Sequence, residues 1–364
     1  MSTPVDVYII NRRDLKIKSF FTTTEWEIKI DYINNSKSSF TNPASVEVAR
    51  GDFLLAKLQS GRFSKLYGSD RIQPFFFGLV SSFENKNKKN VIESVQFYNV
   101  ADNEFSATAK SGTDVKSHLL ALLNRYVLSD ETSLTSRIAV RLEGGNVPYS
   151  YQPSNPPTKT NLRDYFIHMF KKYGVCWNVE WIGPNDRGEL IVSTVLKVSN
   201  DRIKIKNNSL DFFNWSVFIQ EVNKNSDNRL LIIDKRTNNS ESPGILSTWY
   251  LDKNGEITQS SSNVSRPTRT KVAIYDTTVQ NKPSYLSVAQ SELSANNYSH
   301  EIDVSVIDNS ELVRYSDLEI GKKVSVFYNE RELRSILTSL SYKSEHGYFE
   351  LTFGNVRSTI KNLS

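Results

Sequence analysis

The sequence predicts an α+β chain that is mainly β, with two small barrel-like β-regions on either side of a mixed α/β insert. Short runs of alternating apolar and polar residues fill residues 1–110. The period changes to that of amphipathic helices within residues 111–205, and alternating runs return in residues 206–364. We therefore expect three domains with these bounds, the third carrying a short helix and loop insertions.

The composition is that of a chain that folds around hydrophobic cores. Of 364 residues, 38% are hydrophobic and 11% aromatic, which argues against global disorder. No run approaches the ~18 apolar residues of a membrane helix, and the N-terminus lacks the apolar run of a signal peptide. The net charge of +5 is scattered rather than gathered in a stripe, so sequence-specific nucleic-acid binding is not expected.

Strands are expected throughout the first region. The segment 26–32 places Trp26, Ile28, Ile30 and Tyr32 on one face of a strand. Further strands are expected at Phe53–Leu58, Phe75–Val80 and Val91–Phe97. Short strands at this spacing, separated by Gly, Asn and Ser, are typical of a small barrel or sandwich.

Two amphipathic helices are expected in the middle region. The first is capped by Thr113 or Asp114, and the second runs from about Thr160 to Tyr173 and ends at Gly174. The buried stripes are Val115, Leu119, Leu122, Leu123 and Tyr126 in the first, and Leu162, Phe166, Met169, Phe170 and Tyr173 in the second. Their partners should be strands Trp177–Trp181 and Leu190–Val198, with Pro148–Lys159 as a loop.

The third region is expected to return to strands, at Phe212–Glu221 and Arg229–Asp234 and again in the last 65 residues. A short helix is predicted at Tyr285–Leu293, with Leu286, Ala289 and Leu293 on its buried side. The polar stretches Thr237–Ser242 and Gln259–Arg269 are predicted to be loops.

The two β-regions share an outline of a turn glycine followed by three strands. In the first region the segments are Gly51–Ala56, Phe77–Ser82 and Val91–Val95, and in the second they are Gly321–Val326, Leu333–Leu340 and Tyr348–Phe353. This order suggests two copies of one small β-domain in a single chain.

Three runs carry a family resemblance: Ala289–Ile302, Leu318–Val326 and Leu351–Asn355. They resemble the tail-hub proteins of siphophages, which form the N-terminal structural part of tail-associated lysins. These hubs are similar to the central hub of myophage baseplates. The resemblance covers most of the chain in the order of its elements and is most specific over residues 285–358, so a baseplate-hub-like fold is expected.

The resemblance implies a structural protein of the virion tail tip, made in the bacterial host cytoplasm. Such a homotrimer caps the tail tube, adapts the six-fold distal tail protein ring to three-fold symmetry and opens for DNA passage. Three chains with two similar β-domains each would present six near-equivalent units, and exposed strand edges would be used up between neighbouring subunits. The tape-measure protein and receptor-binding proteins are further candidate partners, and DNA would pass without sequence-specific binding.

No catalytic, cofactor-binding or metal-ligating residues are expected. The four histidines, His118, His168, His300 and His346, show no metal-binding spacing with one another or with Cys176. We expect His118 and His168 to face solvent or a helix-packing rim, and Cys176 to be a buried strand residue that forms a dyad only if the fold brings a histidine to it.

Two short sequences suggest binding sites. The second of them would serve an alternative function, that of a receptor- or saccharide-binding module. Arg50-Gly51-Asp52 spells an adhesion tripeptide, but we expect a turn before a strand. A receptor- or saccharide-binding module would use Trp249 and Tyr250, which we expect in a loop.

Two further functions stay open. One is a cell-wall hydrolase, although the chain ends about ten residues after the last expected strand and leaves no room for a hydrolase module. The second is the hub of a related injection machine.

Overall fold

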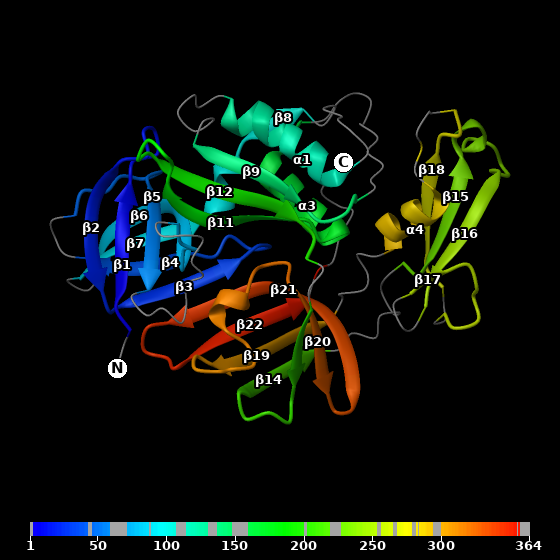
Figure 1. The fold of residues 1–364 in the computed structure, drawn as a ribbon. Coiled ribbons are helices and arrows are strands. Elements are labelled where there is room, and N and C mark those ends of the chain that lie inside the picture. Colours follow the sequence, from blue (N-terminus) through cyan, green and yellow to red (C-terminus); the bar gives the residue numbers. More distant parts are fainter. Residues whose placement is uncertain are drawn as a thin grey trace.

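The fold is mainly β in a computed structural model of the chain (Figure 1). The structure describes residues 3–42, 46–58, 71–86, 89–106, 114–129, 137–147, 159–199, 202–218, 227–252, 256–264, 268–278, 282, 284–293, 300–354 and 356. The expected loop Pro148–Lys159 lies almost wholly outside these residues. So does much of the run Ala289–Ile302.

One large sheet joins the two ends of the chain (Figure 1). Its strand order is β14-β19-β22-β21-β3-β4-β7-β6-β5-β1-β2, with β20 beside β21 and β13 beside β20. The N-terminal strands are β1 (Val5–Ile10), β2 (Ile17–Thr23), β3 (Trp26–Asp31), β4 (Ser38–Asn42), β5 (Phe53–Leu58), β6 (Phe76–Lys86) and β7 (Lys89–Gln96). The later strands are β13 (Arg202–Lys206), β14 (Phe212–Phe218), β19 (Glu301–Ile307), β20 (Lys323–Tyr328), β21 (Arg331–Lys343) and β22 (Tyr348–Gly354).

The alternation expected in the first region is confirmed in β3. Trp26, Ile28 and Tyr32 are buried and Ile30 is partly buried on the same face. These side chains join a hydrophobic core that is continuous with that of the C-terminal strands.

The middle region forms the two expected helices. Helix α1 (Val115–Leu123) continues as a π-helical turn (Asn124–Leu128), and Asp114 caps it by accepting a hydrogen bond from Ser117 N at 3.1 Å. Helix α3 (Leu162–Tyr173) is capped by Asn161 and ends at Gly174, whose φ of 70° is the left-handed conformation expected there.

These helices pack with small sheets (Figure 1). The three-stranded sheet β11-β12-β9 comprises Cys176–Pro184, Leu190–Lys197 and Ile138–Glu143, and β8 (Glu104–Ser106) pairs with β10 (Lys159–Asn161). Short 3-10 turns occur at Phe97–Ala101, Lys235–Thr237 and Tyr315–Asp317.

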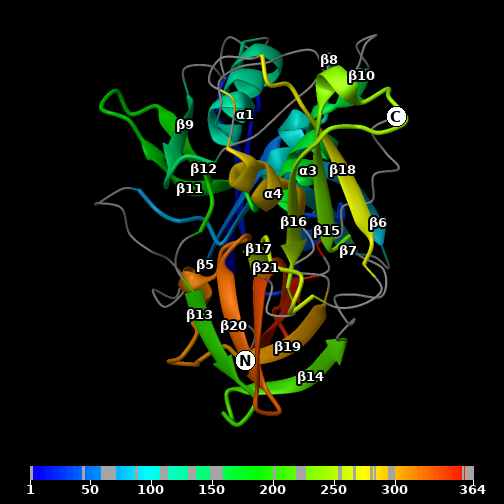
Figure 2. The same cartoon turned by 90° about the vertical axis from the view of Figure 1, so that its right-hand side faces the viewer.

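Part of the third region folds as a separate four-stranded sheet, in the order β17-β16-β15-β18. Its elements are β15 (Arg229–Asp234), β16 (Ile245–Leu251), β17 (Ile257–Thr258), β18 (Thr270–Tyr275) and helix α4 (Tyr285–Leu293). It has its own hydrophobic cluster and stands at one end of the molecule (Figures 1 and 2). We call β15–β18 and α4 the small-sheet unit.

The structure corrects one face of α4 and adds one pairing. Leu286, expected to be buried, is 42% exposed, and Val288 is buried instead with Ala289 and Leu293. Strand β13, which lies at the end of the expected middle domain, pairs in parallel with β20 of the third region. The small-sheet unit lies wholly within the expected third domain, and β13 spans the expected boundary at residues 205 and 206. The bounds of the three domains remain predictions.

Candidate functional site

The turn before β5 is held by three backbone hydrogen bonds. Gly51 has a φ of 90°, which favours glycine. Gly51 N donates to Val80 O at 2.8 Å, Asp52 N donates to Ala49 O at 3.2 Å, and Val80 N donates to Asp52 O at 2.8 Å. These bonds tie the start of β5 to the middle of β6.

The turn before β20 repeats this pattern in the second β-region. Gly321 has a φ of 85°. Gly321 N donates to Leu337 O at 2.8 Å, Lys322 N donates to Glu319 O at 2.9 Å, and Leu337 N donates to Lys322 O at 2.9 Å. Each bond has its counterpart in the first turn, so Gly321 is equivalent to Gly51 and Leu337 to Val80.

The two regions also share a β-bulge at the same place. The register of β6 against β7 shifts between Val80 and Ser82, and that of β21 against β22 shifts between Leu337 and Ser339. A bulge re-aims a strand at a defined residue, so its coincidence with the matched turns makes these two strands equivalent residue by residue.

The equivalence extends over neighbouring strands. The order β3-β4-β7-β6-β5 in the first region corresponds to β14-β19-β22-β21-β20 in the second, with antiparallel pairing at each matching step. The outermost strands differ in direction, because β1 is antiparallel to β5 whereas β13 is parallel to β20. We call these two five-strand sets repeat 1 and repeat 2.

The repeats are joined where β3 of repeat 1 pairs with the second half of β21 of repeat 2. The register places Lys29 opposite Ser341 and Glu27 opposite Lys343. Glu27 forms ion pairs with Lys343 at 3.2 Å and with Lys29 at 2.9 Å. Burial raises the pKa of Glu27, but hydrogen bonds from the two lysines outweigh it and lower that pKa overall. We call this contact the repeat junction.

Aromatic rings fill the repeat junction beneath these strands. Trp26 makes edge contacts with Phe75 and Tyr342, with centroids 5.2 and 5.1 Å apart, and Tyr315 lies 4.7 Å from Phe75. Tyr315 Oη donates to Phe75 O at 2.9 Å, and burial raises the pKa of Tyr315. Of these rings, the sequence pattern identified Trp26 as a core residue; Tyr315 and Tyr342 come from distant segments that share no local periodicity with it.

A pocket of about 130 Å³ opens beside the repeat junction. Its lining is mostly aromatic and aliphatic and includes the amides of Gln73 and Gln96, whose Oε1 atoms are buried without a hydrogen-bond partner. Gln96 is fixed by its Nε2, which donates to Lys29 O at 3.3 Å. The pocket therefore offers shape and two amide oxygens, and nothing in its lining marks a pair of catalytic carboxylates.

The structure corrects the expectation for His118. It is buried between the two helices, where its Nε2 lies 3.1 Å from Tyr165 Oη, and burial lowers its pKa to about 4. His168 is half-buried, with its pKa lowered to about 4 by burial and by Lys172. His300 is buried in the C-terminal region and its pKa is also about 4 because of burial. His346 stacks on Tyr348 at a centroid distance of 4.7 Å.

Cys176 is buried, as expected, and burial raises its pKa. A Cβ added to Gly321 would overlap its Sγ atom, so the sulfur packs directly on the turn of repeat 2. Burial and a raised pKa describe a structural thiol rather than a reactive one.

Arg50-Gly51-Asp52 is part of a turn, as expected. Asp52 is 7% exposed and accepts hydrogen bonds from Lys18 Nζ at 2.9 Å and from Ala49 N at 2.8 Å. Its carboxylate is committed to the fold of repeat 1.

Trp249 and Tyr250 lie in strand β16 and not in a loop. Trp249 packs against the cluster of the small-sheet unit, and its Nε1 is buried without a hydrogen-bond partner. Both residues are only partly exposed, so the exposed aromatic loop expected for saccharide stacking is not present there.

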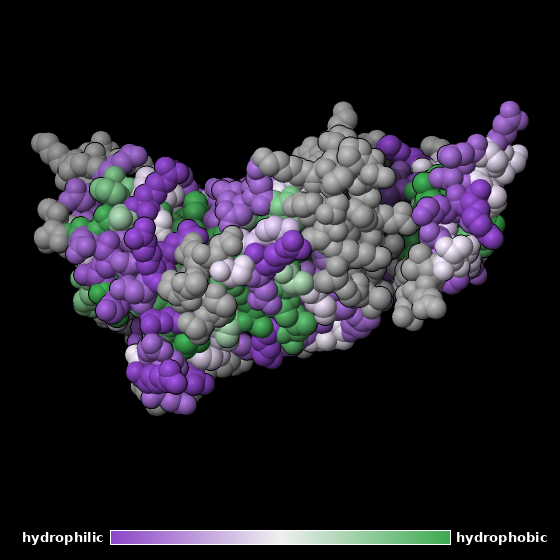
Figure 3. Space-filling view, turned by 90° about the horizontal axis from the view of Figure 1, so that it is seen from above, coloured by the Kyte–Doolittle hydropathy of each residue, from purple (hydrophilic) through white to green (hydrophobic). Residues whose placement is uncertain are grey.

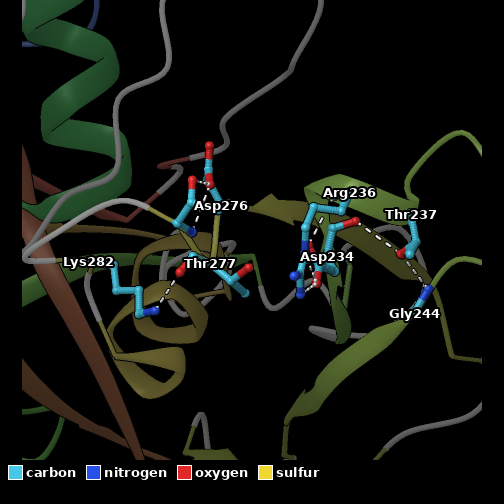
Figure 4. A network of polar contacts seen from close by, with 8 residues as sticks. Asp234, Arg236, Thr237, Gly244, Asp276, Thr277 and Lys282 are labelled. Atoms are coloured by element: carbon cyan, nitrogen blue, oxygen red, sulfur yellow. Dashed lines mark hydrogen bonds and ion pairs between the residues drawn. The ribbon is translucent and has the colours of Figure 1, made fainter.

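The expected loop Thr237–Ser242 connects β15 to β16 and is tied down at its base (Figure 4). Asp234 accepts from Arg236 N at 3.0 Å and from its guanidinium at 2.6 Å, and Thr237 Oγ1 accepts from Gly244 N at 2.8 Å. Nearby, Lys282 Nζ donates to Thr277 O at 2.7 Å. The loop is therefore a braced turn at the tip of the small-sheet unit.

Two kinds of feature are absent from the described ranges. They contain no group of three or more His, Cys, Asp or Glu residues placed to hold a metal ion. No helix in this part of the chain is long and apolar enough to cross a membrane.

Comparison with solved structures shows which known proteins have a similar fold. No protein-family model and no curated protein matches the sequence. Among solved structures, the chain is similar to the 43 kDa tail protein of prophage MuSo2 from Shewanella oneidensis, with a TM-score of 0.53, 10% identity and coverage of 97% of this chain and 98% of that one.

Two further structures agree. A tail protein from Neisseria meningitidis MC58 matches with a TM-score of 0.51 and 10% identity over 96% of each chain. Prophage tail protein gp18 from Listeria monocytogenes matches with a TM-score of 0.50 and 10% identity over 100% of this chain and 97% of its own. These likenesses run through the whole length of both chains, so this chain has the fold of prophage tail proteins.

Proposed function

We propose that this chain is the structural hub of a phage tail tip or baseplate, assembled as a homotrimer. The observation that carries the proposal is the pair of repeats with matched turns, bulges and strand order. Three such chains present six near-equivalent units, which is what a three-fold particle needs in order to seat on a six-fold ring.

The fold likeness to prophage tail proteins supports the proposal, and so do open strand edges. Strands β14 and β2 end the large sheet, and within the described residues each pairs on one side only. Exposed edges of this kind are usually blunted or covered in a soluble monomer. Assembly between copies of the chain would cover them.

The proposed partner above the trimer is the distal tail protein ring, contacted by the two repeats. The tape-measure protein and receptor-binding proteins are further proposed partners. DNA would pass along the axis without sequence-specific binding, and the braced turn Thr237–Ser242 is one candidate element of the distal closure. The second candidate, Pro148–Lys159, lies almost wholly outside the described residues.

The function is proposed to be structural rather than enzymatic. Structural roles for two candidate residues support this proposal: Cys176 is buried and burial raises its pKa, and His118 Nε2 lies 3.1 Å from Tyr165 Oη in the packing of the two helices. Zymography on host cell walls tests this expectation. Clearing by the pure protein that a single substitution abolishes would replace the hub with a cell-wall hydrolase.

Particle mass and symmetry test the hub directly. Light scattering at high protein concentration should report three copies of the 41.5 kDa chain, and electron micrographs should show three-fold particles under a six-fold ring. A stable dimer or a six-fold homohexamer contradicts the proposal.

A further inference from the structure

We propose that the pocket beside the repeat junction binds a small planar cation with several N–H donors, of the amidinium or guanidinium class. The pocket lies where repeat 1, the middle region and the C-terminal part of the chain meet. The site belongs to the single chain, so it depends on neither the trimer nor the ring of the proposed hub.

The pocket has the size of one small planar group. Its volume is about 130 Å³, and a cavity of ~150 Å³ in a protein core accepts a benzene molecule. Tyr32, Phe75, Trp177 and Tyr315 line it, and each of them is at most 7% exposed. The walls are therefore parts of the packed core, and the pocket keeps its shape when it is empty.

Aromatic side chains dominate the walls, since they supply eight of the nineteen lining residues. Two of the phenol groups are engaged with the backbone, because Tyr98 Oη donates to Asp31 O at 2.9 Å and Tyr315 Oη donates to Phe75 O at 2.9 Å. Aromatic faces carry negative potential and attract cations, and a flat guanidinium also stacks on them. The walls therefore favour a flat cation.

The polar atoms left over in the lining are hydrogen-bond acceptors. Gln96 Nε2 donates to Lys29 O at 3.3 Å, and because that carbonyl can only accept, the amide nitrogen must face it. The Oε1 atoms of Gln96 and Gln73 are buried and have no hydrogen-bond partner within the described part of the chain. A buried acceptor without a donor destabilises the fold, so a ligand that brings donors is favoured.

The charge of the lining excludes anions. Glu319 is the one charged side chain among the described lining residues. Its carboxylate accepts from Asn178 Nδ2 at 2.9 Å and forms an ion pair with Lys197 Nζ at 2.7 Å. A phosphate or carboxylate would meet amide oxygens, aromatic faces and this carboxylate in the lining, and no cationic side chain there would bind it.

A planar cation fits this lining better than an alkylammonium ion or water does. An ammonium ion is compact and strongly hydrated, so it loses more on entering an apolar pocket than the weakly hydrated guanidinium does. The N–H groups of a guanidinium or amidinium point in several directions within one plane, so one ligand can donate to two separate acceptors. Water can donate to the same amides, but it gains nothing from the aromatic walls.

Three probes of nearly the same shape test the ligand class. Calorimetric titration of the full-length protein should show saturable binding of benzamidine, a planar amidinium. Benzoate has the same outline but carries negative charge and only acceptors, so it should bind at least about tenfold more weakly. Benzamide, which is neutral and has one N–H₂ group, should have an affinity between the two.

Two substitutions of opposite expected effect place the binding in this pocket. Gln73→Met keeps the length of the side chain but removes an acceptor, so it should weaken benzamidine binding about tenfold. Gln73→Glu adds a negative charge and should tighten benzamidine binding and weaken benzoate binding further. Gln290→Met is the matched control, because Gln290 is exposed on α4 and outside the lining.

Assembled tails identify the source of the cation. If the natural occupant is an arginine side chain of a partner protein, benzamidine should bind the isolated chain but not the assembled tail. If it is a free molecule, benzamidine should bind both. Either result supports the site.

Other results overturn the proposal. Absence of saturable benzamidine binding would leave the pocket to water alone. Equal affinity for benzamide and benzamidine, or for benzoate and benzamidine, contradicts the preference for a cation. Affinities that Gln73→Met and Gln73→Glu leave unchanged, or that Gln290→Met changes as much, would place benzamidine elsewhere on the chain.

Discussion

Gly321 and Gly51 occupy equivalent turns with different surroundings, which gives a matched test of what each turn tolerates. Both have positive φ, so an added Cβ costs about 1–2 kcal/mol at either position. At Gly51 the Cβ would meet nothing within 4 Å, whereas at Gly321 it would overlap Cys176 Sγ.

We expect Gly321→Ala to lower the free energy of unfolding by about 1–3 kcal/mol more than Gly51→Ala does, because overpacking adds to the backbone cost. Urea denaturation of both variants measures the difference. Equal losses would show that the sulfur moves aside.

The buried histidines predict a dependence of stability on pH. The pKa values of His118, His168 and His300 are lowered to about 4 by burial, from an unfolded value of about 6.5. Between these values the unfolded chain binds more protons than the folded one, so the free energy of unfolding falls as pH drops from about 6.5 toward 4.

Carboxylates affect the free energy of unfolding only at lower pH. The pKa of Glu292 is lowered to about 2, chiefly because Lys172 and Lys271 outweigh its burial, so its contribution is lost only below its unfolded value of 4.5. Urea unfolding at pH 7 and pH 5 therefore isolates the histidines, and His118→Gln should flatten the slope between them. A free energy of unfolding that is the same at both pH values contradicts the prediction.

The burial of His118 shows what local periodicity misses. Its helix shows a clear stripe of Val115, Leu119 and Leu122, and His118 stands beside that stripe. The sequence predicts the helix but not that Tyr165 of another helix would lie within hydrogen-bonding reach. Contacts between elements decide such positions, and periodicity carries no information on them.

At the scale of elements, Glu292 connects the small-sheet unit to the middle region. Its carboxylate accepts from Lys172 of α3 at 2.6 Å and from Lys271 of β18 at 2.7 Å, with 16% of its side chain exposed. Glu292→Gln leaves two half-buried lysines facing each other, so we expect a loss of about 1–3 kcal/mol.

The loss should be local to the small-sheet unit. Hydrogen exchange within Arg229–Leu293 should rise in Glu292→Gln while that of the large sheet stays the same. Glu256→Gln is the control, because Glu256 is 69% exposed and its pair with Arg334 spans 3.5 Å. Equal exchange in the two variants would mean that the unit docks through different contacts.

The elements themselves were largely predictable because their signals are local. Helix α4 begins and ends where the pattern indicates, and β3, β5 and β15 lie where strands were expected. The separate sheet was not predicted, since the order β17-β16-β15-β18 depends on a parallel pairing of β15 with β18, two strands that β16 and β17 separate along the chain. For the same reason Trp249 was expected in a loop.

At the scale of the molecule, the small-sheet unit and the large sheet present different surfaces. The unit stands at one end, where hydrophobic side chains show between hydrophilic ones (Figure 3), and Val272 and Ile274 of β18 are 51% and 45% exposed. The strand path of the large sheet instead ends at β14 and β2. If the repeats contact the ring of the distal tail protein, we expect the small-sheet unit to lie on the side of the particle that faces away from this ring.

Ring docking should depend on assembly of the chain. In the proposed hub, one repeat offers a single contact to a six-fold ring, whereas a trimer offers six that act together through effective concentration. We therefore expect the chain, when diluted until light scattering reports one copy, to bind the distal tail ring about 10² times more weakly than it does at concentrations where three copies assemble. Biolayer interferometry with the immobilised ring protein measures both affinities.

Leu312→Asp is the control, because Leu312 is 61% exposed and lies outside the helices and strands. This variant should bind the ring as the wild-type protein does. If monomer and trimer bind equally well, or if the middle region makes the ring contact, multivalent seating fails.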